Sequence, residues 1–187
     1  DVKAVILQRS KGYDWRSTLS CEELGKIISY IKSIKKDAIC IVDNCYGEFV
    51  EKTEPTEYGA DLVVGSLIKN PGGSLAQTGG YIAGKKECVE NAAFRLTSPG
   101  LGKEVGASLG VLEKFYQGLF LAPHTVKECI KGSLLIGMAM TMLGYGTLPK
   151  MNKAPCDITR SVIFNDESKL IAFIQSVQEV SPIDSFV

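Results

Sequence analysis

Three polar residues that could carry chemistry lie just after short apolar runs of the sequence. Asp43 follows the run AICIV, and Ser66 and Lys69 lie within DLVVGSLIKNPGG. Such runs are typical of strands buried on both faces of a parallel sheet, and ligands bind beyond the carboxyl ends of these strands. We therefore expect a carboxylate, a hydroxyl and an amine at one edge of a sheet, a set suited to proton transfer and to covalent amine chemistry.

Two interpretations of Lys69 are open at this point. An ionised Asp43 beside a buried strand is costly without a cation, so Lys69 could form a simple ion pair with it. Alternatively, a dry pocket would lower the lysine pKa from about 10.4 and allow a Schiff base with a carbonyl. Pyridoxal phosphate is such a carbonyl cofactor, and it also requires a carboxylate at its pyridine nitrogen and donors at its phosphate. Asp43, Ser66 and Lys69 meet these three demands.

The elements that must position these residues alternate between strands and helices. Apolar runs predict strands within residues 2–8, 37–44, 60–66 and 79–84. Ser20 and Glu23 have the spacing of a capping box, which predicts a helix between the first two strands. The sequence thus predicts an α/β fold with a mostly parallel sheet flanked by helices, containing a right-handed βαβ unit.

Further helices are expected in the second half of the chain. Helical periodicity covers residues 86–96 and 104–119. Pro123 is expected to end the second of these helices. Thr125 and Glu128, again at capping-box spacing, are expected to begin a new and longer one.

A change of composition near the C-terminus indicates a second, smaller α/β unit. Residues 158–165 are predicted to form a strand and residues 166–180 an amphipathic helix. We predict that residues 1–122 are part of a large domain. Residues 123–187 are predicted to form a long linking helix and part of a small C-terminal domain.

Composition and charge argue against several classes of function. Lys plus Arg and Asp plus Glu both total 21, so no net charge favours nucleic acid or an anionic membrane. The most apolar stretch, residues 132–146, is shorter than the roughly 20 residues of a membrane span. Six cysteines without a CxxC pair and a single histidine predict reduced thiols, a cytoplasmic location and no metal site.

The motif residues also carry a family resemblance. VDNCYGEF followed by GADLVVGSLIKNPGGSLAQTGGYIAG resembles the core of the fold type I pyridoxal-phosphate enzymes, in particular the cystathionine and methionine gamma-lyases. Over essentially the whole chain, the sequence is similar to the aluminium resistance proteins of this group. The resemblance implies an aspartate aminotransferase-like large domain. It also implies that Asp43 pairs with the pyridine nitrogen, Ser66 contacts the phosphate, and Lys69 forms the Schiff base (aldimine) and acts as the catalytic residue.

The activity implied by this resemblance is a pyridoxal-phosphate-dependent carbon–sulfur lyase, of the cystathionine beta-lyase or methionine gamma-lyase type, with an amino-acid substrate. A homodimer or homotetramer is implied because the family's sites are shared between subunits. The family's glycine-rich phosphate turn and carboxylate-binding arginine have no match here, so further N-terminal and C-terminal parts of the same protein are expected.

Two departures from the family pattern bear on the substrate chemistry. Ile68 replaces the usual hydroxyl residue before the lysine, and Cys45 replaces the usual threonine after the aspartate. Transamination on the same fold and a non-catalytic relative therefore stay open as alternatives. Release of a keto acid together with ammonia would separate lyase activity from transamination. Arg9, Ser10 and Tyr46 are further candidates for ligand contact, against an ordinary packing role.

Overall fold

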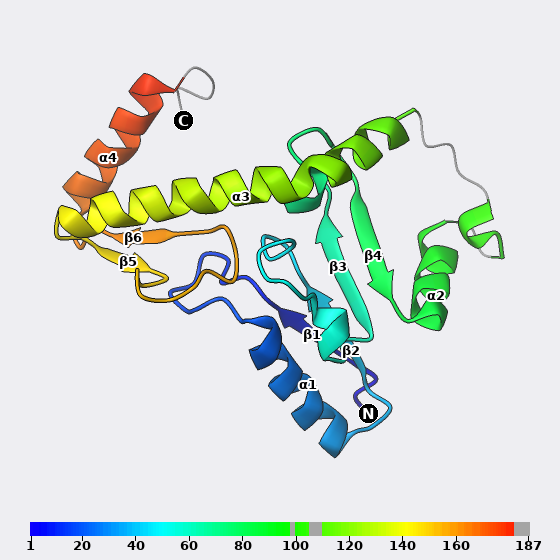
Figure 1. The fold of residues 1–187 in the computed structure, drawn as a ribbon. Helices are drawn as coiled ribbons and strands as arrows, with labels where there is room; N and C mark the ends of the chain where they lie inside the picture. Colours follow the sequence, from blue (N-terminus) through cyan, green and yellow to red (C-terminus); the bar gives the residue numbers. More distant parts are fainter. Residues whose placement is uncertain (98–99, 105–109, 182–187) are drawn as a thin grey trace.

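The computed structural model describes residues 1–97, 100–104 and 110–181, and its larger sheet has four strands (Figure 1). In spatial order these are β1 (Ala4–Gln8), β2 (Ile39–Asp43), β3 (Leu62–Ser66) and β4 (Gly80–Gly84). The first three strands are parallel, and β4 pairs antiparallel with β3. The predicted, mostly parallel α/β sheet is confirmed, and each strand lies within its predicted range.

Helix α1 (Cys21–Ile34) covers one face of this sheet and begins at the predicted capping box. The Ser20 hydroxyl accepts from the Glu23 amide at 3.1 Å, and the Glu23 carboxylate accepts from the Ser20 amide at 2.8 Å. Leu24 and Ile28 of the helix are buried against the sheet in the main apolar cluster. A predicted local signal therefore sets the start of the helix that closes this face.

The remaining elements follow β4 along the chain. They are α2 (Lys86–Leu96), α3 (Leu112–Met142), β5 (Gly146–Leu148), β6 (Ser161–Ile163) and α4 (Glu167–Val180), with single 3₁₀ turns η1 (Pro55–Tyr58), η2 (Asn70–Gly72) and η3 (Gly102–Glu104). The predicted helices at 86–96 and 166–180 and the strand within 158–165 are confirmed. No strand was predicted at β5, which is short and pairs antiparallel with β6.

Helix α3 differs from the prediction at both of its expected boundaries. It is one helix of 31 residues that runs through Pro123, so the predicted break and the new capping box at Thr125 are wrong. The Thr125 hydroxyl instead lies 3.4 Å from the Leu121 carbonyl oxygen of the preceding turn. Ala122 and Val126 on either side are buried, and this packing maintains the helix although proline lacks an amide donor. The helix begins at Leu112 and not at residue 104; residues 105–109 lie outside the described part.

Figure 1 shows α3 running from the four-stranded sheet to the β5–β6 hairpin, with α4 at its far end. The helix contacts η2 near one end and β5 near the other. Because the helix is continuous across residues 122 and 123, the proposed domain boundary there does not coincide with a helix end. The division into residues 1–122 and 123–187 stays a prediction. No helix in the described part of the chain is long and apolar enough to cross a membrane.

The backbone of α3 is in direct contact with the backbone of the turn after Lys69, because both have glycine where they cross. A Cβ atom on Gly118 would overlap the carbonyl oxygen of Gly72, and a Cβ atom on Gly73 would overlap the carbonyl oxygen of Gly118. Gly73 also has a φ of 54°, which favours glycine over other residues. The long helix therefore clamps the turn that follows Lys69 by direct backbone contact.

The opposite end of β3 is fixed by a buried carboxylate. Asp61 is 1% exposed and accepts from the Cys40 amide at 2.7 Å. The ammonium groups of Lys32 and Lys85 each lie 2.6 Å from its oxygens. Burial alone would raise the pKa of Asp61, but the Cys40 amide and the two lysines outweigh burial and lower it to about 2.

We expect Gly118→Ala to destabilise the protein by about 1–3 kcal/mol, because the added methyl group would force α3 away from the Lys69 turn. Gly132→Ala is a matched control in the same helix, where an added Cβ meets nothing within 4 Å. This control should be neutral or stabilise by up to about 1 kcal/mol, because alanine has the higher helix propensity. Urea unfolding of both variants tests the clamp. Equal stability of the two would show that the contact imposes no constraint.

We expect Asp61→Asn to lower the free energy of unfolding at pH 7 by about 2 kcal/mol. The folded pKa of Asp61 is depressed from 3.8 to about 2, so its contribution is present above about pH 4 and is lost as the pH falls toward 2. Urea titrations of the wild type and the variant should therefore converge below about pH 4. A difference that stays constant down to pH 2 would contradict this role.

Candidate functional site

The three predicted site residues lie at the carboxyl edge of the parallel strands. Asp43 is the last residue of β2 and Ser66 the last of β3, and the pairing places Asp43 opposite Val64. Lys69 directly precedes η2, and its amide donates to the Ser66 carbonyl oxygen at 3.3 Å. The predicted placement at one edge is confirmed, while the roles of the three side chains stay predictions.

The Lys69 amine lies over an aromatic ring of the neighbouring loop. Its Nζ is 4.4 Å from the centre of the Tyr46 ring, a distance suited to a cation–π contact. Tyr46 has a φ of 71°, a strained conformation for a non-glycine residue. The Ile158 amide, from the segment before β6, donates to the Tyr46 carbonyl oxygen at 3.2 Å. Contacts from two parts of the chain therefore hold Tyr46 beneath the lysine.

The ion-pair interpretation of Lys69 has no support in this arrangement. Within the described residues, neither Asp43 nor Lys69 belongs to an ion pair. Asp43 instead accepts from the Cys45 amide, at 3.1 Å from its Oδ1 atom. The amine and the carboxylate are thus separate groups at the edge, and each can meet a different part of a ligand.

The predicted lowering of the Lys69 pKa is wrong. Burial lowers the pKa, but the neighbouring groups Cys45, Tyr46 and Asp43 outweigh burial and raise it above its ordinary value. Lys69 is only half-buried, so the desolvation expected of a dry pocket is incomplete. The amine is therefore protonated at neutral pH in the chain as it stands.

Cys45, which the sequence marked only as a departure from the family pattern, lies next to the Asp43 carboxylate. Burial raises the pKa of its thiol, and its backbone amide donates to the Asp43 Oδ1 atom at 3.1 Å. The signal in the sequence was its position two residues after Asp43, combined with the departure from threonine. Cys45 therefore lies beside Asp43, and it is among the groups that raise the pKa of Lys69.

Arg9 is buried and bound to protein groups, which is the packing role, and a ligand contact of Arg9 stays a prediction. It is completely buried, and its guanidinium donates to the Asn44 Oδ1 atom at 2.6 Å and pairs with Glu51. Gly47 makes room for it, since a Cβ atom there would overlap the Arg9 side chain. Ser10 is likewise occupied, because its hydroxyl donates to Asp157 at 3.0 Å. The buried arginine thus shapes the loop that follows Asp43.

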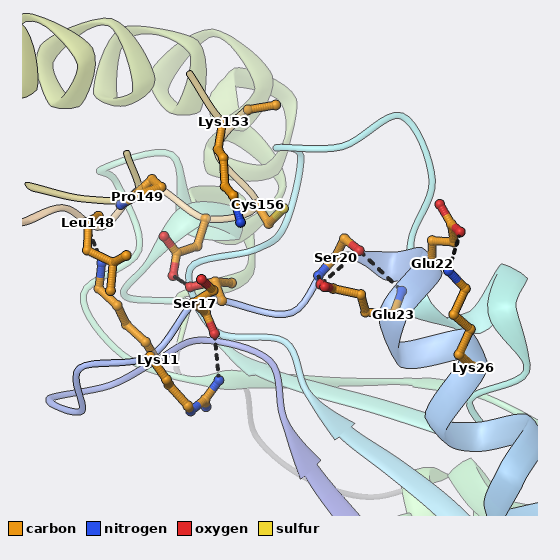
Figure 2. A pocket seen from close by; sticks show the side chains of 14 residues that line it. Lys11, Ser17, Ser20, Glu22, Glu23, Lys26, Leu148, Pro149, Lys153 and Cys156 are labelled. Carbon is orange, nitrogen blue, oxygen red and sulfur yellow. Dashed lines mark hydrogen bonds and ion pairs between the residues drawn. The ribbon is translucent and has the colours of Figure 1, made fainter. Parts of the chain in front are cut away.

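A polar cavity of about 400 Å³ lies apart from these residues, between the start of α1 and the segment after β5 (Figure 2). Lys11 reaches across it and donates to the Leu148 carbonyl oxygen at 3.0 Å. Burial and, to a smaller extent, Arg160 lower the pKa of Lys11, although Asp157 opposes them. Asp43, Ser66 and Lys69 do not line this cavity, so it is not a site for the predicted chemistry.

Comparisons with known proteins agree on one family. The family model of methionine gamma-lyase matches residues 1–187. The uncharacterized 33.9 kDa protein in the glnA 5' region of Lactobacillus delbrueckii subsp. bulgaricus is 51% identical over 183 residues, which are 98% of this chain and 60% of that protein. The uncharacterized protein YnbB of Bacillus subtilis (strain 168) is 48% identical over 99% of this chain and 44% of its own length.

A solved structure supports the same relationship. A carbon-sulfur lyase involved in aluminum resistance from Clostridium novyi NT superposes with a TM-score of 0.92 at 50% identity, covering 99% of this chain and 44% of that chain. The fold expected from the sequence is therefore confirmed. The chain spans about half the length of the relatives that it matches.

We expect Cys45→Ala to lower the pKa of Lys69, because the variant removes the leading interaction that raises it. The pH dependence of Lys69 acetylation, followed by mass mapping of its peptide, measures this change. Cys129→Ala, which removes an exposed thiol on α3, is the control and should leave the profile unchanged. A Lys69 profile that is the same in all three proteins would contradict the assigned contact.

Proposed function

The chain belongs to the methionine gamma-lyase family, and from this we propose that the protein containing it is a pyridoxal-phosphate-dependent lyase acting on a sulfur-containing amino acid. The supporting observation is the grouping of Asp43, Ser66 and Lys69 at the carboxyl edge of β2 and β3. This is the edge where ligands bind in parallel sheets. The carbon-sulfur lyase of Clostridium novyi NT, with 50% identity, supports the reaction class.

The side chains at the edge suit the proposed cofactor. No described residue forms a hydrogen bond with the Ser66 hydroxyl, so this group is available to a phosphate oxygen. The Cys45 amide fixes the Asp43 carboxylate, which would hold a protonated pyridine nitrogen. Lys69 contributes the amine, and its position before η2 is fixed by the glycine contact with α3.

When bound, pyridoxal phosphate supplies an electron sink that stabilises negative charge on the α-carbon of an amino acid. Lys69 is the group of this chain that can take up and return a proton at that carbon. Its raised pKa means that the amine is charged at rest, so a positive neighbour such as a pyridinium ring would be needed to lower it. Tyr46 covers one side of the amine and restricts its direction.

Elimination of a sulfur-bearing side chain is the specific reaction that we propose. Cys45 takes the position of the usual threonine, and this departure bears on substrate choice. We therefore propose a class of substrate, the sulfur-containing amino acids, and not one compound. Transamination on the same site would form a keto acid without releasing ammonia. A homodimer or homotetramer is part of the proposal, because sites in the family are shared between subunits.

We expect Lys69→Ala in the full-length protein to reduce turnover by about 10³-fold or more, because it removes both the cofactor amine and the proton carrier. The assay measures ammonia and keto acid from L-cystathionine, L-methionine and L-cysteine. The fold should be retained, since Lys69 is half-buried and belongs to no ion pair among the described residues. Lys86→Ala, at an exposed position of α2, is the matched control. Unchanged turnover in Lys69→Ala would contradict the catalytic role of Lys69.

A further inference from the structure

Glu48 is a buried carboxyl group that the proposed chemistry does not use. It is 4% exposed, and its Oε1 atom accepts from the Tyr81 hydroxyl at 2.9 Å. Its Oε2 atom is buried and has no hydrogen-bond partner among the described residues. Burial, with a smaller effect of the Glu54 charge, raises the pKa of Glu48 to about 7, although the Tyr81 hydrogen bond and Arg9 partly oppose this.

A buried carboxyl oxygen without a hydrogen-bond partner lowers the stability of the fold. Its surroundings are an apolar cavity of about 470 Å³, lined by side chains such as Leu67, Pro71 and Phe115. A leucine would fit this environment without leaving a buried oxygen unsatisfied. Stability alone therefore does not account for a glutamate at this position.

The contacts of Glu48 reach the segment that carries Lys69. The Glu48 carbonyl oxygen accepts from the Asn70 side-chain amide at 3.0 Å. Asn70 directly follows Lys69 and is itself 4% exposed. Tyr46, whose ring lies under the Lys69 amine, is only two residues before Glu48. A displacement of Glu48 would thus move both the backbone beside the lysine and the ring beneath it.

The Glu48 side chain touches the strand that carries Ser66. Tyr81 lies opposite Gly65 in the pairing of β4 with β3. A Cβ atom on Gly65 would overlap both the Tyr81 ring and the Glu48 Oε1 atom. Gly65 directly precedes Ser66, the predicted phosphate contact. The pair of Tyr81 and Glu48 therefore supports β3 next to that residue.

Glu48 also belongs to the segment that follows Asp43. The Asn44 side-chain amide lies 3.4 Å from the Tyr81 hydroxyl oxygen and 2.8 Å from a Glu54 oxygen. Asn44 in turn accepts from the buried Arg9. The hydrogen bonds around Tyr81 therefore connect both Glu48 and the residue next to Asp43 with β4.

We propose that the Glu48 side chain is a positioning group of the site: through Tyr81 and Gly65 it supports the strand that ends at Ser66, and it anchors the backbone carbonyl oxygen that accepts from Asn70 beside Lys69. This inference rests on the proposed function for its consequence, which is tight binding of pyridoxal phosphate. The arrangement itself does not depend on the cofactor, because every contact lies within the chain.

The test compares four single variants of the full-length protein and one double variant. Glu48→Leu and Tyr81→Phe each remove the hydrogen bond between the two side chains, whereas Glu48→Gln keeps an acceptor for Tyr81. Asp61→Asn is the control for stability, since it loses a buried carboxylate at the opposite end of β3. Glu48→Leu removes an unsatisfied buried oxygen but leaves the Tyr81 hydroxyl without its acceptor, so its free energy of unfolding is measured beside that of Asp61→Asn.

Two measurements separate positioning from stability. The first is the dissociation constant of added pyridoxal phosphate, which should rise about tenfold in Glu48→Leu and in Tyr81→Phe. The second is the rate of Lys69 acetylation without cofactor, which should change about threefold in the same two variants. Glu48→Gln and Asp61→Asn should match the wild type in both. The effects of Glu48→Leu and Tyr81→Phe should not add in the double variant, because both break one bond.

The outcomes are distinguishable from those of the proposed function. Unchanged acetylation of Lys69 in Glu48→Leu and Tyr81→Phe overturns the positioning role, whether or not the wild type binds the cofactor. A second outcome is that acetylation of Lys69 changes in these variants while the wild-type protein takes up no pyridoxal phosphate. This outcome supports the positioning role and refutes the proposed function. If Asp61→Asn alters Lys69 to the same degree, the effect is one of stability and the proposal is refuted.

Discussion

The parallel pairing of β2 with β3 is the constraint on which the candidate site depends. It aligns the carboxyl ends of two strands, and it is fixed beyond the strands by two backbone hydrogen bonds of 2.9 Å, from Asn44 to Val64 and from Asp61 to Cys40. A shift of one residue would turn Asp43 to the opposite face of the sheet. The carboxylate and the hydroxyl of the site are therefore positioned by sheet register, before any loop contributes.

The loops beyond the strands are held by contacts from distant parts of the chain. Gly118 of α3 clamps the turn after Lys69, the buried Arg9 supports the loop after Asp43, and Glu48 connects the two. None of these contacts is a surface ion pair, and each involves buried groups whose loss is costly. A lysine on a flexible loop would lose more entropy on meeting a ligand than one already fixed.

Local patterns were sufficient to predict the elements that carry the site. The apolar runs ending at Asp43 and Ser66 gave the strands, and the pair of Ser20 and Glu23 gave the start of α1. Both are signals encoded within a few residues. The edge location of Lys69 followed from the strand that precedes it.

Features that depend on tertiary contacts were missed. Pro123 was expected to end a helix, but packing of Ala122 and Val126 keeps α3 continuous. The raised pKa of Lys69 depends on Cys45, and the buried Glu48 carboxyl group accepts its hydrogen bond from Tyr81 on another strand. No periodicity in the sequence encodes which side chains meet across the sheet.

The central claim is that Lys69 is the attachment point of pyridoxal phosphate. Its most direct test is borohydride reduction of the wild-type full-length protein after incubation with the cofactor, with the absorption spectrum recorded before and after and the modified peptide mapped by mass. The account predicts a visible absorption band that reduction removes and a pyridoxyl group on Lys69. A label on another amine, such as that of the buried Lys11 with its lowered pKa, or no label at all, would contradict it.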